Sequence, residues 1–261
     1  MAPPEQLENL RNDDGGFGSV EGAPSEAEPT AMLAQVFDDQ RARAWLLANQ
    51  RDDGSFGLAV GSVFRDVTPL GALALRPGPE RERALDYLVG VTGRNGPDPA
   101  VSARGWPWTD GAHGWTEPTA WGLLALRVLR PAATDRIDDA RAVLRERECV
   151  GGGWNYGSRI AFEVQLEPYV QTTAVALLAL GSEDQDLLDR GTAELERSWS
   201  SESDGLMSLA TATCALRAVG SRSAGAASAA LERAAAAGTT DCVTFAWIAF
   251  ATEGRGLWNW G

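Results

Sequence analysis

Lysine is absent from this chain of 261 residues, so arginine supplies all 23 of its basic side chains, against 36 aspartates and glutamates. The formal net charge is −13. A negative surface repels phosphate backbones and anionic lipid headgroups. We therefore expect neither nucleic acid nor an anionic membrane as a partner.

Histidine and cysteine are also scarce. The chain has one histidine, His113, and three cysteines, Cys149, Cys214 and Cys242, which lie far apart. An odd number of dispersed cysteines is typical of reduced thiols rather than of a disulfide framework. Because no Cys-x-x-Cys pair supplies neighbouring ligands, a zinc site would need ligands from four repeats. We expect no metal and no cofactor.

Long apolar runs are missing too. No run approaches the roughly 18 residues that a transmembrane helix needs, and the first residues have neither the basic nor the apolar region of a secretory leader. We therefore expect no transmembrane segment and a cytoplasmic location. Nothing in the sequence predicts the oligomeric state.

The sequence does contain a repeated passage, which occurs six times in all. In its fullest form, residues 113–129 (HGWTEPTAWGLLALRVL), a glycine-aromatic loop leads into an acidic residue, then Pro-Thr-Ala, then a helix that is apolar on nearly every face. A helix of that kind is buried on all sides. The aligned threonines are 33 to 54 residues apart: Thr30, Thr68, Thr119, Thr173, Thr211 and Thr244.

Amphipathic segments alternate with these buried helices and predict an outer layer. They span residues 38–50, 79–92, 134–148, 183–199 and 225–237, and no segment shows the alternation of a strand. A unit of roughly 40 residues with one buried helix cannot bury its own apolar face, so such units must stack. We predict an all-α fold, an α/α toroid of six helical hairpins in a single domain over residues 1–261. The first hairpin is expected to be incomplete, because few residues precede Glu28.

Acidic residues stand two positions before the threonine in the first three units: Glu28, Asp66 and Glu117. One interpretation is structural, because a carboxylate at a helix start caps free N–H groups and faces the positive end of the helix dipole. The other is catalytic: the carboxyls meet at one end of the axis, where apolar walls keep one protonated as a general acid. Glu117 is the first candidate, since His113 and Trp115 precede it closely, and Glu28 is the second.

Aromatic residues can line such a site, because the face of an aromatic ring stabilises positive charge without reacting with it. The candidates for substrate contact lie at loop–helix junctions or on the buried helices: Trp115, Trp121, Trp154, Tyr156, Phe245 and Trp247. For the glycine-flanked Phe17, Phe56 and Trp154, the alternative is packing between repeats.

The long loop of residues 93–115 contains Trp106, Trp108 and His113. A long loop in a compact domain is often functional, yet its tryptophans can equally cover one end of a ring. His113 can serve as a base, a metal ligand or a hydrogen-bonding loop residue. Cys149, just before three glycines, is either a reactive thiol or a small apolar plug.

Two kinds of segment carry a resemblance to a known family. Residues 49–56 (NQRDDGSF) and 152–154 (GGW) are similar to the QW motifs of squalene and oxidosqualene cyclases. The Thr-Ala helices resemble the inner helices of that α/α toroid, which protein prenyltransferase β-subunits share. The similarity runs from Asp13 to Ala251 and includes small bacterial single-domain members. It implies a toroid with a central apolar cavity and a hydrophobic, isoprenoid ligand.

The chain departs from each well-understood branch of that superfamily. Class II terpene cyclases carry Asp-x-Asp-Asp-Thr-Ala, whereas Pro29, Val67 and Pro118 stand directly before the threonines here, so the second carboxylate is missing. Prenyltransferases hold zinc with an Asp-x-Cys pair, whereas Asp241 directly precedes Cys242. The cysteine and histidine motifs of lanthipeptide cyclases are absent.

Three function classes follow. The first is an isoprenoid-handling enzyme resembling class II terpene cyclases, in which Glu117 or Glu28 protonates an alkene in an aromatic-lined axial cavity. The second is a non-catalytic toroid that binds a lipid, a peptide or a partner protein. The third is a carbohydrate-active toroid with paired carboxylates. A hollow apolar axis favours the first class, a filled axis the second, and an open polar groove with carboxyls ~5–10 Å apart the third.

Overall fold

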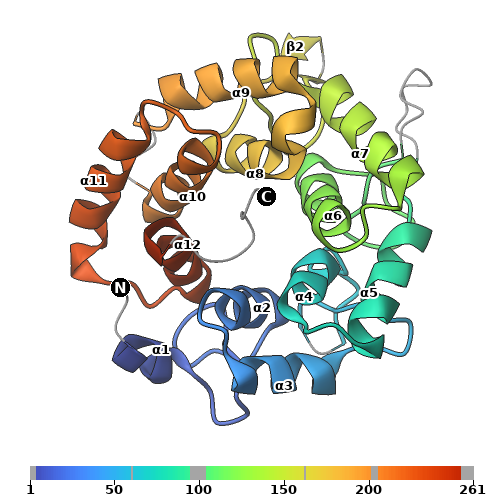
Figure 1. Ribbon diagram of the computed structural model, residues 1–261, viewed down its shortest axis with the longest axis vertical. Helices are drawn as coiled ribbons and strands as arrows, with labels where there is room; N and C mark the ends of the chain where they lie inside the picture. Colours follow the sequence, from blue (N-terminus) through green and yellow to red (C-terminus); the bar gives the residue numbers. More distant parts are fainter. Residues whose placement is uncertain (1–3, 60, 95–103, 162, 201–204, 254–261) are drawn as a thin grey trace.

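The computed structural model describes residues 4–59, 61–94, 104–161, 163–200 and 205–253. Its helices form two concentric rings (Figure 1). The inner ring contains α2 (Ala27–Val36), α4 (Thr68–Ala74), α6 (Thr116–Leu129), α8 (Val170–Leu180), α10 (Leu206–Ala218) and α12 (Cys242–Glu253). The outer ring contains α1 (Pro4–Leu10), α3 (Gln40–Asn49), α5 (Pro79–Gly90), α7 (Thr134–Arg147), α9 (Gln185–Ser198) and α11 (Ala224–Ala234).

The inner ring is closed. Each inner helix packs against the inner helix that follows it along the chain, and α12 packs against α2. The predicted all-α toroid is thereby confirmed, with a first outer helix, α1, that spans only seven residues. Within the described parts of the chain, no helix combines the length and the apolarity that crossing a bilayer requires.

The two rings differ in how much surface they bury. In α8, all residues except Gln171 are buried, whereas the amphipathic α11 buries only Ala227 and Leu231. Fully burying a leucine side chain stabilises a fold by about 2 kcal/mol. The inner helices therefore form the core, and the outer helices shield it from solvent.

The repeated threonines attach each glycine-aromatic loop to its inner helix. In the first four units the threonine Oγ1 accepts a hydrogen bond from the backbone N–H of a buried aromatic residue. These bonds, 2.9 or 3.0 Å long, join Phe17 to Thr30, Phe56 to Thr68, Trp106 to Thr119 and Trp154 to Thr173. The packing interpretation of Phe17, Phe56 and Trp154 is confirmed, since all three are fully buried.

Glycine is required where these rings lie against the inner helices. A Cβ added to Gly122 would stand 2.7 Å from Cδ2 of Trp106, and one added to Gly71 would stand 2.4 Å from Cδ2 of Phe56. Both glycines follow their threonine by three residues. In the second and third units, loop, threonine and glycine therefore form one packing unit, whereas Leu33 and Ala176 hold the equivalent position in the first and fourth.

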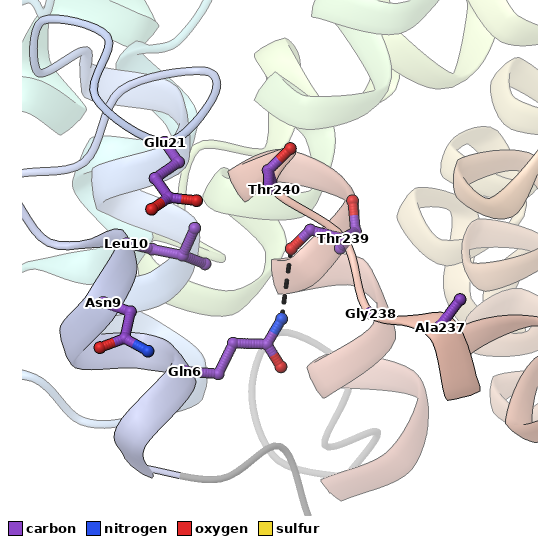
Figure 2. A pocket seen from close by; sticks show the side chains of 8 residues that line it. All are labelled: Gln6, Asn9, Leu10, Glu21, Ala237, Gly238, Thr239 and Thr240. Atoms are coloured by element: carbon purple, nitrogen blue, oxygen red, sulfur yellow. Dashed lines mark hydrogen bonds between the residues drawn. The ribbon is translucent and has the colours of Figure 1, made fainter.

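The seam between the first and last hairpins closes through backbone contacts, because α1 is short. The amide of Cys242 donates to the carbonyl oxygen of Ser19 over 2.9 Å. Gln6 Nε2 donates to the carbonyl oxygen of Thr239 over 3.2 Å (Figure 2). An open depression of about 700 Å³ lies at this seam, lined by Gln6, Asn9, Leu10, Glu21, Ala237, Gly238, Thr239 and Thr240.

A small hairpin between α7 and α8 was not predicted. Strands β1 (Ile160–Ala161) and β2 (Val164–Gln165) pair antiparallel. Each strand has two residues, which is too short for an alternating pattern to show in the sequence. Two short 3-10 helices, η1 (Gly181–Glu183) and η2 (Ala235–Ala237), complete the regular elements of the described chain.

Candidate functional site

Three acidic residues lie at the starts of three neighbouring inner helices. Glu28 and Glu117 lie in the first turns of α2 and α6, and Asp66 lies two residues before α4. Because an outer helix returns the chain each time, the inner helices all run in one direction and begin at the same end of the ring. We call Glu28, Asp66 and Glu117 the acid cluster.

The side chains of the acid cluster influence one another electrostatically. Burial raises the pKa of Glu28 from 4.5 to about 8, and the charges of Glu117 and Asp66 add to that rise. Burial, followed by the charge of Asp66, raises the pKa of Glu117 to about 7. Burial also raises the pKa of Asp66 to about 6. All three residues are nevertheless only half-buried, so part of each remains accessible.

The structural interpretation of these acidic residues is supported only in part. None of the helices α2, α4 and α6 has a side-chain hydrogen bond at its N-cap, and Oδ1 of Asp66 is buried without a hydrogen-bond partner. Asp39, at the start of α3, makes such a bond, with Oδ1 accepting from the amide of Ala42 over 2.8 Å. Glu28 and Glu117 nevertheless lie in the first turns of α2 and α6, where a carboxylate faces the positive end of the helix dipole, so this part of the structural interpretation stands.

A pair of tryptophans lies across the ring axis. Trp121 on α6 and Trp247 on α12 have ring centroids 5.9 Å apart and are 6% and 2% exposed. Helices α6 and α12 stand on opposite sides of the inner ring (Figure 1). Side chains therefore fill the axis at this level, where the family resemblance implies an apolar cavity.

The tryptophan pair adjoins the acid cluster. Trp121 follows Glu117 by one helical turn, and its indole N–H donates a hydrogen bond to the Glu117 carboxyl, which lowers the pKa of Glu117 against the effect of burial. Burial, Asp66 and Trp121 are the influences on the pKa of Glu117, and neither His113 nor Trp115 is among them.

A cavity of about 10 Å³ borders Asp66, with room for about one water molecule. Arg65, Tyr87 and Pro118 are among the residues that line it. Of the acid cluster only Asp66 lines this cavity.

Two of the aromatic residues predicted to contact substrate belong to the core instead. Trp154 is fully buried, and its indole N–H donates to the carbonyl oxygen of Leu144 over 2.7 Å. Phe245 is buried and stacks on Phe37, with centroids 5.8 Å apart. Both rings therefore pack in the core, as the alternative interpretation expects for Trp154.

Other aromatic residues are exposed beside the acid cluster. Trp115 and Tyr156 were predicted, and both are exposed. Tyr169, the N-cap residue of α8, was missed, and it packs on Tyr156 with centroids 5.2 Å apart. A sequence signal existed: Tyr169 precedes Thr173 by four residues, as Trp115 precedes Thr119.

His113 and Cys149 lie outside this arrangement. His113 is exposed, and its Nδ1 lies 3.3 Å from the carbonyl oxygen of Arg94. Cys149 is buried, which raises the pKa of its thiol, and Asn155 Nδ2 donates to its sulfur over 3.4 Å. The apolar-plug interpretation of Cys149 fits this burial better than a reactive thiol. Among the described residues, no group of three or more histidine, cysteine or acidic side chains could hold a metal ion.

The depression at the seam is a weaker candidate. Of its eight lining residues only Glu21 carries a charge, and none is aromatic. The acid cluster instead combines several perturbed carboxyls with aromatic neighbours, which is the usual constitution of a catalytic site.

Comparisons with known proteins address the fold. No known family model matches the sequence, and no curated protein does either. A crystal structure of a protein from Actinoplanes is similar, with a TM-score of 0.59 and 16% identity over 94% of this chain and 77% of that one. A mutant of Rex8A from Paenibacillus barcinonensis, complexed with an arabinofuranosyl-xylotetraose, has a TM-score of 0.57 and 11% identity, over 98% of this chain and 91% of that one. At these identities the likeness extends to the arrangement of helices and no further.

Proposed function

We propose that this toroid is a carbohydrate-active enzyme that hydrolyses glycosidic bonds with the carboxyls of the acid cluster. The observation that carries the proposal is the placement of the three carboxyls at one end of the inner ring, where burial raises the pKa of each, to about 8 for Glu28 and about 6 for Asp66. Glycoside hydrolysis requires one protonated and one ionised carboxyl at the same pH. The toroidal likeness to Rex8A, a protein complexed with an oligosaccharide, supports this choice.

The separated pKa values assign the roles. Near neutral pH Glu28 holds its proton and donates it to the glycosidic oxygen, so that the bond from the anomeric carbon to this oxygen breaks. Asp66 is ionised and takes a proton from a water molecule, whose oxygen forms the new bond to the anomeric carbon. Glu117 raises the pKa of Glu28 through its charge. The acid is therefore assigned to Glu28 rather than to Glu117, the first candidate from the sequence.

The tryptophan pair closes the axis beneath these carboxyls. A filled axis argues against the hollow cavity of a terpene cyclase and is also what a non-catalytic toroid predicts, and it leaves a ligand of the acid cluster only the loop end of the ring to enter from. A sugar ring needs only a shallow polar site with an aromatic floor. This is the physical reason for preferring carbohydrate to isoprenoid.

The test is to incubate the protein with a panel of oligosaccharides, beginning with xylotetraose, and to measure hydrolysis as the release of reducing ends. We expect turnover by the wild-type protein and a loss of about 10²–10⁴-fold in kcat for Glu28→Gln and Asp66→Asn. Glu21→Gln removes an exposed carboxyl at the seam and serves as the control with unchanged turnover. Equal turnover by Glu28→Gln and the wild type would refute the assignment.

A second candidate is the acid-initiated terpene cyclisation that the sequence resemblance implies. The protonated Glu28, above two indole rings, is the feature that favours it. The same variants incubated with farnesyl, geranylgeranyl and squalene substrates separate the two reactions. Cyclised product from these substrates and no hydrolysis of any glycan would replace the carbohydrate proposal. No product from either set would assign the protein to the non-catalytic class.

A further inference from the structure

Three exposed aromatic side chains lie at the loop end of the ring. Trp115, Tyr156 and Tyr169 are 36%, 47% and 46% exposed. We call these three residues the aromatic platform. Large aromatic side chains are usually buried, so a contiguous exposed group of them points to a binding surface.

Contacts in the structure hold the platform together. The rings of Tyr156 and Tyr169 have centroids 5.2 Å apart. The Trp115 ring lies against Gly157, where an added Cβ would stand 2.8 Å from Cε3 of the indole. The amide of Thr116 donates to the carbonyl oxygen of Tyr156 over 2.9 Å, which fixes the loop beside α6. The rings are therefore held in place before any ligand arrives, which lowers the entropy cost of binding.

The platform is continuous with the acid cluster. Trp115 is the N-cap residue of α6, two residues before Glu117, and Tyr169 is the N-cap residue of α8. Helices α6 and α8 pack side by side (Figure 1). A ligand that reaches Glu117 and extends towards α8 therefore meets these rings.

The aromatic residues recur at one repeat position. Phe64 precedes Thr68 by four residues, as Trp115 and Tyr169 precede their threonines, and it is 43% exposed. Trp115 and Tyr169 are N-cap residues, whereas Phe64 lies in the loop before α4, whose N-cap residue is Val67. The two helix-start rings, Trp115 and Tyr169, both remain exposed.

We infer that the aromatic platform is a sugar-binding subsite, which takes a ring of the oligosaccharide away from the bond that is cleaved. This inference rests on the proposed function. The C–H face of a pyranose is apolar and packs on an aromatic face, while its hydroxyls remain in water or reach the tyrosine hydroxyls. A second copy of this chain is a poorer occupant, because two molecules that each carry a net charge of −13 repel each other. The natural substrate is then an oligosaccharide longer than a disaccharide.

The experiment measures binding without turnover. Glu28→Gln is titrated with xylobiose and xylotetraose by isothermal calorimetry, alone and combined with Tyr169→Ala, Tyr169→Phe or Tyr156→Ala. We expect the tetraose to bind at least about fivefold more tightly than the biose. Tyr169→Ala and Tyr156→Ala should abolish this advantage, and Tyr169→Phe, which keeps the ring, should restore it.

A matched control is Leu47→Ala on α3, whose side chain has the same exposed fraction as Tyr169, 46%. It should leave the binding of both sugars unchanged. Equal affinity for the two sugars, or full binding by Tyr169→Ala, would overturn the subsite. Self-association of the wild type in sedimentation, abolished by Tyr169→Ala, would assign the platform to a dimer instead.

The two proposals fail in different ways. Ring-dependent binding of xylotetraose without hydrolysis by the wild type would leave the subsite standing and refute the enzyme. Hydrolysis that depends on Glu28 but is equally fast for biose and tetraose would leave the enzyme standing and refute the subsite.

Discussion

The indole of Trp121 lies against that of Trp247, with ring centroids 5.9 Å apart, although the two residues come from opposite helices of the inner ring. This contact divides the axis. The carboxyls of Glu28 and Glu117 begin their helices at the loop end, and Trp121 follows one turn later on α6. The chemistry that the acid cluster supports is therefore confined to the loop end, with an aromatic floor beneath it.

The first prediction concerns the hydrogen bond from Trp121 to Glu117 and the pKa of Glu117. In Trp121→Phe the ionised carboxyl loses its donor, so the pKa of Glu117 should rise above its value of about 7. Carboxyl ¹³C NMR of Glu117 across pH 4–10 measures this directly. The control is Trp45→Phe, which removes another indole donor, 2.9 Å from Oδ2 of Asp14, and should leave Glu117 unaffected. A lower pKa for Glu117 in Trp121→Phe would contradict the account.

Burial of Glu28 makes the stability of the protein depend on pH. The pKa of Glu28 is raised from 4.5 to about 8 in the folded protein. The free energy of unfolding is therefore highest below pH 4.5, where Glu28 is protonated in both states, and it falls as the pH rises through 8. Glu28→Gln cannot ionise. We expect it to be more stable than the wild type at pH 9 by about 1–3 kcal/mol, and to show no such gain at pH 4. Urea unfolding at pH 4 and pH 9 measures this difference. Glu21→Gln is the control for the loss of one negative charge. An equal gain in stability at both pH values would show that ionisation of Glu28 is not its cause.

The threonine-to-loop bond predicts a stability loss. Thr173→Val leaves the buried amide of Trp154 without its acceptor, which should cost about 1–3 kcal/mol in the free energy of unfolding. Thr213→Val is the matched control, because the hydroxyl of Thr213 donates only within its own helix, to Leu209. Denaturant unfolding should separate the two variants by at least about 1 kcal/mol. Equal stabilities would show that the bond contributes nothing.

Gly122 gives a steric prediction. The Cβ of Gly122→Ala would collide with Trp106, and relief of that contact should cost about 1–3 kcal/mol. Gly225, on α11, has open space around the corresponding position. Gly225→Ala should therefore stabilise the protein by about 0.5–1 kcal/mol. Thermal unfolding of both variants measures these changes. A destabilised Gly225→Ala together with an unchanged stability of Gly122→Ala would contradict the steric prediction.

The ring could be predicted from sequence because its physical determinants are local. The spacing of Thr30, Thr68, Thr119 and Thr173 records one loop-to-helix bond per unit. Closure follows from the need of each apolar helix for neighbours on both sides. The meeting of acidic side chains could also be inferred, since equivalent positions in successive units share one end of the ring.

The fine structure of the site could not be predicted in this way. The contact of Trp121 with Trp247 depends on the width of the ring, which no local pattern encodes. Trp154 and Tyr156 are two residues apart, yet one is fully buried and the other is exposed. Sequence proximity to a candidate acid was equally misleading for His113, because electrostatic partners are set by tertiary distance.

The most direct measurement is the titration of Glu28 by carboxyl ¹³C NMR in the wild type, in Glu117→Gln and in Asp66→Asn. The account predicts a midpoint near 8 in the wild type and a lower midpoint in each variant, because each removes a negative charge that raises the pKa of Glu28. A wild-type midpoint near 4.5 that neither substitution changes would show that the three carboxyls do not share a site.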